Sequence, residues 1–386
     1  MNLTDTSEKM IINVVDQFDY STQNDVYNES FKTWRKNKQN PYAFNFKQNR
    51  KESVFVDGKG FESKSAAAAE RDCISKIMYI AGIAMLMWIV IDNIIGKIIV
   101  GIFDFMGFDI HTSMFSTSWY GGSSEIISSL MGISFVKLLV PLIYLHKKLK
   151  MPRQVEHMST LNHTPDLIGA ICMTMAISAV ASLPNIYTNR TWQLFNYFRS
   201  INADISVWNQ EQFVVYTIFD IIIISIMTEL LFRGAIFGAL RQFGDRYAIV
   251  ITSAMAGLLV QDFREFPAAV LISAVASVSM LRSGSIFTSI FVQVVFKMYR
   301  LALVLLEENS SDPAFLRRNS FILIAFVSGA AGVIILYLIR GTKYTRLAVY
   351  KSEITCKERL NIACKSFPAP AVICLCLLSA IIKLIF

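Results

Sequence analysis

Long apolar stretches alternate with short polar ones over most of the chain after residue 75. Most of these stretches approach the ~20 residues that a helix needs to cross the hydrocarbon core of a bilayer. The two stretches that flank residue 262 are shorter than the others. This pattern predicts eight to nine membrane-spanning helices, at about residues 77–101, 123–145, 165–186, 211–240, 247–261, 266–281, 284–306, 320–340 and 367–386.

Composition leads to the same class of protein. Hydrophobic residues make up 54% of the 386 residues and the mean hydropathy is +0.45, an excess that soluble domains of this length rarely carry. We therefore predict an all-α polytopic protein of the cell membrane, with the lipid bilayer as its environment and no nucleic acid partner. The six cysteines lie mostly in or beside apolar segments and the four histidines form no metal-type cluster, so we expect no cofactor and no metal.

Four regions follow from the distribution of polar residues. Residues 1–75 carry charges of both signs, which predicts a partly disordered cytoplasmic segment. Within it, the stretch from Lys32 to Lys51 is basic and aromatic. It is either an arm that touches anionic lipid headgroups or a loosely ordered tail. Residues 76–210 contain three predicted spans with their loops, and residues 211–306 form a central core. Residues 307–386 contain the last spans and a basic cytoplasmic loop.

The lysines and arginines of short loops predict the orientation. Residues 146–153 and 340–365 are rich in Lys and Arg, whereas residues 102–122 contain neither. Basic loops stay on the cytoplasmic side of a membrane. The predicted order of spans then places the N-terminus in the cytoplasm, together with the turn at residues 241–246.

Polar residues from three predicted spans fall at one depth of the membrane. Glu229 and Arg233 lie four positions apart, and so do Gln293 and Lys297, so the members of each pair share a helix face. At 1.5 Å per residue, Glu229 and Gln261 each lie roughly 18–22 Å from the turn between their helices. Lipid offers no hydrogen-bond partner, so these groups must satisfy one another. Ionisable groups within a span mark a functional site or a buried pair. The predicted layer contains Thr228, Glu229, Arg233, Gln261, Gln293 and Lys297.

Asp220 lies on the same predicted helix face as Thr228, two turns away. This spacing corresponds to roughly 12 Å along the helix. The carboxylate either lines a lumen, or sits in the interface region, or pairs with a neighbouring residue.

The residues from Thr228 to Gly234 resemble the first motif, Glu-Glu-x-x-x-Arg, of the CPBP family, the CAAX proteases and bacteriocin-processing enzymes that are also called the Abi family. The resemblance continues through Gln261, where the family has Phe-x-x-x-His. It ends with the Gly-Ser turn that begins at Gly284 and with Lys297, where the family has His-x-x-x-Asn or Asp. It implies a CAAX-protease-like helical bundle and an intramembrane glutamic endopeptidase that acts on prenylated or leader peptides.

The same resemblance shows that most catalytic positions are substituted. Glu229 and Arg233 match the family, whereas Thr228 replaces the first glutamate and Gln261 replaces the histidine of the second motif. The resemblance implies that those two family residues activate the attacking water. In the third motif, which is implied to steady the oxyanion, Gln293 and Lys297 replace the histidine and the Asn or Asp, and Gly257 replaces the phenylalanine of the second motif.

Chemistry leaves three hypotheses for this layer. A general base must take and return a proton near neutral pH, and neither a threonine nor a glutamine does so. In the first hypothesis Glu229 bridges Arg233 and Lys297 and locks three helices together as part of a membrane scaffold. In the second the layer binds an anionic or prenylated peptide, or a membrane protein partner, without cleavage. In the third Glu229 alone supports residual proteolysis.

Overall fold

The computed structural model describes residues 25–37, 40–44, 53–56, 60–63, 66–112, 119–156, 164–182, 210–263, 265–307, 312–340 and 354–385. Residues 1–24 lie outside this description, and so do residues 341–353 of the predicted basic stretch 340–365. The described residues form helices joined by short turns, and two small antiparallel hairpins.

Seven helical stretches among the described residues are long and apolar enough to cross a bilayer, which confirms an all-α polytopic membrane protein. An eighth is present if α17 and α18, which are bent by 71° from each other, cross together. The helices that contribute to these spans include α4 (Ala66–Val90), α5 (Gly96–Phe105), α6 (Ser123–Leu149), α8 (Thr164–Ser182), α10 (Gln210–Ile218), α14 (Phe266–Ser283), α15 (Ile286–Glu307), α16 (Asp312–Arg340), α17 (Cys356–Lys365) and α18 (Ala369–Ile385).

Two predicted spans differ from the structure in length or shape. The span predicted at residues 247–261 is α13 (Asp245–Leu259), whose 15 residues reach about 22 Å and fall short of a ~30 Å hydrocarbon core. Ten of its side chains are nevertheless buried, because helices surround it. The last predicted span is the 17-residue helix α18, which follows a sharp bend after α17.

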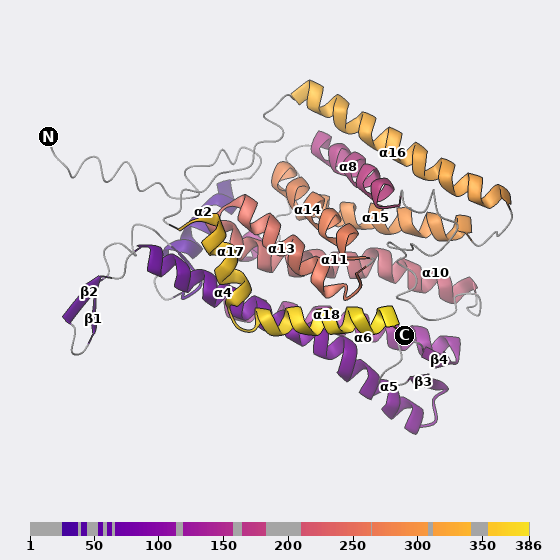
Figure 1. Cartoon of the computed structure of the whole chain (residues 1–386), viewed down its shortest axis with the longest axis horizontal. Helices are drawn as coiled ribbons and strands as arrows, with labels where there is room; N and C mark the ends of the chain where they lie inside the picture. Colours follow the sequence, from indigo (N-terminus) through magenta and orange to yellow (C-terminus); the bar gives the residue numbers. More distant parts are fainter. Residues whose placement is uncertain are drawn as a thin grey trace.

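The helices lie side by side in a bundle with α16 and α8 along one edge, α14, α15 and α13 in the middle, and α4, α6 and α18 beyond them (Figure 1). Close approach of α16 to α8 depends on two glycines. A Cβ atom on Gly329 would lie 2.6 Å from the backbone nitrogen of Ala176, and one on Gly332 would lie 2.4 Å from Sγ of Cys172. Small residues at such contacts let membrane helices pack closely.

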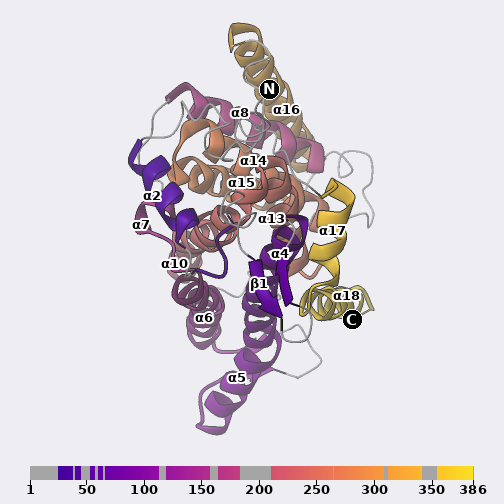
Figure 2. The ribbon, with the colours of Figure 1, turned by 90° about the vertical axis from the view of Figure 1, so that its left-hand side faces the viewer.

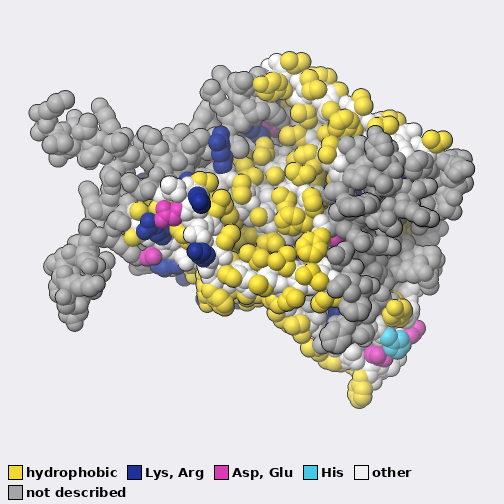
Figure 3. Space-filling model, viewed as in Figure 1, with side chains coloured by type: hydrophobic (Ala, Val, Ile, Leu, Met, Phe, Trp, Pro, Cys, Tyr) yellow, Lys and Arg dark blue, Asp and Glu magenta, His cyan; other side chains and the backbone are white. Residues whose placement is uncertain are grey.

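The two ends of the bundle carry different small elements. Helices α2 and α17 and the β1–β2 hairpin lie at one end, and the β3–β4 hairpin follows α5 at the other (Figures 1 and 2). Hydrophobic side chains cover the middle of the face seen in Figure 3, and charged side chains gather around α17 at one end of that face. These elements have the bounds α2 (Asp25–Lys36), α7 (Arg153–Glu156), β1 (Ser53–Val56), β2 (Gly60–Ser63), β3 (Ile110–Thr112) and β4 (Trp119–Gly121).

Part of the N-terminal segment packs against the bundle. The indole Nε1 of Trp34 donates a hydrogen bond to the carbonyl of Leu149 at 3.0 Å, and the backbone N–H of Phe44 donates to Oε1 of Gln242 at 2.8 Å. Trp34 and Phe44 are both buried. A loosely ordered tail is therefore the wrong description of residues 25–37 and 40–44. The rest of the predicted basic arm, residues 45–51, lies outside the described residues.

Candidate functional site

The fourth span is an irregular helix around Glu229. Two π-helical segments, η4 (Phe219–Ile224) and η5 (Leu230–Phe237), flank the short helix α11 (Ser225–Glu229). A π-helical turn holds more residues than an α-helical turn and is frequent at functional sites. The span ends in α12 (Gly238–Leu240) and the 3₁₀ turn η6 (Arg241–Phe243).

Glu229 and Arg233 form a buried ion pair. Nη1 of Arg233 lies 3.1 Å from Oε1 of Glu229, and neither side chain has exposed surface. Nη2 of Arg233 also donates to the carbonyl of Ser273 at 2.5 Å and to its hydroxyl at 2.8 Å. The predicted contact of Glu229 with Arg233 is thus confirmed, and the pair connects the fourth span to α14.

The carboxylate of Glu229 also faces α15. The side chains of Ser289 and Gln293 lie near enough to interact electrostatically with this carboxylate. Neither carboxylate oxygen nevertheless has a hydrogen bond of good geometry. Three elements, α11, α14 and α15, therefore meet at one charged pair that has unused acceptor capacity.

Lys297 does not join the Glu229–Arg233 pair. Its Nζ lies 2.9 Å from Oδ1 of Asp220 and 2.7 Å from the backbone carbonyl of the same residue. The prediction that Glu229 bridges both cations is therefore wrong. Asp220 is nine residues before Glu229, so the two ion pairs lie roughly 13 Å apart along the fourth span. Of the three predicted positions for Asp220, the structure shows the one that pairs with a neighbour.

Thr228 and Gln261 stand where the family has its two implied water-activating residues. Both side chains form hydrogen bonds with residues other than Glu229 and Arg233. The hydroxyl of Thr228 donates to the carbonyl of Ile224 in its own helix at 2.7 Å. Gln261 lies just beyond the end of α13 with a φ of 54°, and its Oε1 accepts a hydrogen bond from Nδ2 of Asn93 at 2.8 Å. The hydrogen bonds of these two side chains therefore run to Ile224 and Asn93, rather than to the Glu229–Arg233 pair.

Gly257 lets α13 and α14 approach each other closely. A Cβ atom on Gly257 would lie 2.4 Å from Cγ2 of Val270 and 3.1 Å from the ring of Phe266. Residues of α14 therefore fill the space next to Gly257. A side chain at this position requires α14 to shift.

Asn93 and Ser273 contact the polar layer, although neither was predicted to belong to it. Asn93 lies in a third π-helical segment, η1 (Ile91–Ile95), beside Asp92, which pairs with Lys137 of α6 at 2.9 Å. Each of four polar pairs thus has a member in a π-helical segment: Asp92–Lys137, Asn93–Gln261, Asp220–Lys297 and Glu229–Arg233. The polar residues Asp92 and Asn93 inside an apolar run were the available signal, whereas Ser273 is one of several serines in α14 and nothing in the sequence distinguishes it.

Residues 210–299 match the family model described as type II CAAX prenyl endopeptidase Rce1-like. This segment, called the Rce1-like domain below, is therefore similar to the type II CAAX prenyl endopeptidases of the CPBP family. The matched segment contains all six positions of the predicted polar layer. Comparisons with curated proteins and with solved structures gave no match. Within the described part of the chain, no group of three or more His, Cys, Asp or Glu side chains is arranged to hold a metal ion.

Proposed function

We propose that this protein is a non-catalytic CPBP-type membrane protein, in which the Rce1-like domain serves as a scaffold within the bilayer. The observation that carries the proposal is the set of partners around Glu229. The glutamate is paired with Arg233 and has no exposed surface. Thr228 and Gln261 stand where the family has the two residues that are implied to activate water. Their side chains form hydrogen bonds with Ile224 and Asn93.

General-base chemistry supports this proposal. A base must contact the water from which it takes a proton, and it must exchange that proton near neutral pH. The hydroxyl of Thr228 and the amide of Gln261 cannot do so in this pH range. Glu229 has the required carboxylate, but it is paired with Arg233 and has no exposed surface, whereas a base needs contact with water. The pair instead joins the fourth span to α14 and α15.

The alternative function is an active intramembrane endopeptidase for prenylated or leader peptides. One observation favours it. Both carboxylate oxygens of Glu229 lack a hydrogen bond of good geometry, although buried carboxylates normally have such partners. A water molecule or a peptide amide bound there would satisfy them, so this alternative depends on access to Glu229 in the bilayer.

A restoration experiment tests the proposal. General acid–base assistance typically contributes 10²–10⁴-fold to a rate and an oxyanion donor about 10²–10³-fold, so the natural chain should cleave peptide at background rate. The minimal restored variant carries Thr228→Glu, Gln261→His, Gln293→His and Lys297→Asn. Asp220→Asn is added as a fifth substitution, because Lys297→Asn would leave the Asp220 carboxylate without the Lys297 ammonium. The variant with all five substitutions is the fivefold variant.

The readout is cleavage of a quenched-fluorescence prenylated peptide, and separately of a leader peptide, in proteoliposomes. We expect signal above background from the fivefold variant only, and no signal from Thr228→Glu alone, because Gln261 still cannot move a proton. Cleavage by the natural chain would overturn the proposal.

We further propose that the N-terminus and the end of the bundle with α2 and α17 face the cytoplasm. The support is the basic segment 146–153 and the absence of Lys and Arg from residues 102–122. In a variant without the six native cysteines, Lys150→Cys should react with a membrane-impermeant maleimide only from the cytoplasmic side. Met106→Cys, which is 65% exposed, should react only from outside. Labelling of both from one side would contradict this orientation.

A further inference from the structure

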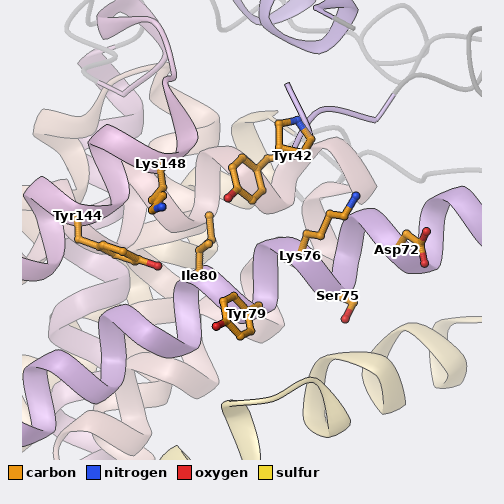
Figure 4. A pocket seen from close by; sticks show the side chains of 9 residues that line it. Tyr42, Asp72, Ser75, Lys76, Tyr79, Ile80, Tyr144 and Lys148 are labelled. Atoms are coloured by element: carbon orange, nitrogen blue, oxygen red, sulfur yellow. The ribbon is translucent and has the colours of Figure 1, made fainter. Parts of the chain in front are cut away.

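A cavity of 550 Å³ lies at the end of the bundle that carries α2, far along the chain from the Rce1-like domain (Figure 4). The first half of α4 and the last turns of α6 form its walls, and residues 41 and 42 complete its rim. Its volume lies within the roughly 300–1,000 Å³ of small-molecule sites. It is lined by Pro41, Tyr42, Asp72, Ser75, Lys76, Tyr79, Ile80, Tyr144 and Lys148.

Two lysines at this cavity have no carboxylate partner among the described residues. Lys76 and Lys148 are exposed, and Tyr42 lies between them in Figure 4. By contrast, Lys137 and Lys297 inside the bundle each lie 2.9 Å from an aspartate oxygen. The only carboxylate in the cavity lining is that of Asp72, so the lining has a net positive charge.

Neutral hydrogen-bond donors complement the two cations. The phenol group of Tyr144 is near enough to those of Tyr42 and Tyr79 to interact with each electrostatically. Cations and O–H donors around one cavity suit a ligand with several anionic oxygens, as a phosphate group has.

The position of the cavity indicates where that phosphate comes from. Ile80 lines the cavity on the side that leads into the apolar part of α4, whereas Lys148 belongs to the basic last turn of α6. Tyrosines and lysines at this boundary sit at the level of lipid headgroups. We propose that this cavity binds a phosphate group, supplied by the headgroup of an anionic phospholipid.

A lipid-binding experiment on the full chain tests this site. The protein in detergent is titrated with short-chain phosphatidylglycerol, with phosphatidylcholine and with inorganic phosphate, and bound ligand is measured by native mass spectrometry. The variant Lys76→Gln/Lys148→Gln removes both cavity cations. The matched control Lys147→Gln/Lys150→Gln removes two exposed lysines of the same basic segment that do not line the cavity.

We expect Lys76→Gln/Lys148→Gln to weaken phosphatidylglycerol binding roughly ten- to thirtyfold, since each lysine near a membrane surface contributes about a factor of five. The control should change it less than threefold, and phosphatidylcholine should bind weakly to every variant. Cavity-dependent binding of inorganic phosphate at equal strength would retain the phosphate site but overturn the lipid as its source. Equal losses in the two double variants, or none in either, would overturn the site itself.

Discussion

Glu229→Gln should destabilise the protein strongly, because it leaves the Arg233 guanidinium buried without its counter-charge. Removing one partner of a buried ion pair typically costs about 3–5 kcal/mol. Both side chains are completely buried, so water cannot replace the lost carboxylate. Arg233 keeps its hydrogen bonds to Ser273, which places the expected cost near the lower end of that range. At about 2 °C per kcal/mol, the melting temperature should fall by roughly 6–8 °C.

Thermal unfolding in detergent, followed by intrinsic fluorescence, measures this change. Glu211→Gln is the matched control, because it removes the same charge from an exposed position at the start of the fourth span. The control should shift the melting temperature by less than about 1 °C. The double variant Glu229→Gln/Arg233→Met should recover part of the loss, since it removes the uncompensated cation. An unchanged melting temperature in Glu229→Gln would refute the structural role of the pair.

Two further predictions use the other charged contacts. Lys297→Met and Asp220→Asn should be strongly non-additive with each other in a double-mutant cycle, because they form one pair. Each should be additive with Glu229→Gln to within about 0.5 kcal/mol, because the two pairs lie roughly 13 Å apart. His111 lies in β3, and Asp104 lies in the last turn of α5. The hydrogen bond and the negative charge of Asp104 raise the pKa of His111 above its usual value. The stabilising contribution of protonated His111 is therefore complete below its ordinary pKa and is lost as the pH rises through the raised one. A titration followed by NMR should show Asp104→Asn lowering this pKa, and an unchanged pKa would contradict the contact.

The sequence predicted the helical membrane fold well because the hydrophobic effect acts on each span separately. A run of apolar residues near the length of the bilayer forms a helix whatever its neighbours are. The prediction was less accurate for α13, which is short but shielded by other helices, and for the bend between α17 and α18. It also missed the docking of Trp34 and Phe44, since the indole of Trp34 and the backbone N–H of Phe44 bond to residues more than 100 positions away.

The site was predictable within one helix and much less so between helices. Glu229 and Arg233 are four residues apart, so the geometry of a single turn fixes their contact. The partner of Lys297 depends on how α15 and the fourth span are rotated against each other. The π-helical segments η4 and η5 change that rotation, because they hold more residues per turn than an α-helix. Side-chain directions worked out for 3.6 residues per turn therefore no longer hold. Nothing in the residue pattern of this stretch reveals where such segments form.

The most direct test of the account is peptide cleavage by the natural chain and by Glu229→Ala, reconstituted in proteoliposomes at equal amounts of folded protein. The substrate is the quenched-fluorescence prenylated peptide, and vesicles without protein give the background. The account predicts that both proteins release fluorescence at the background rate. Release by the natural chain that disappears in Glu229→Ala would contradict it and would assign the role of catalytic base to Glu229.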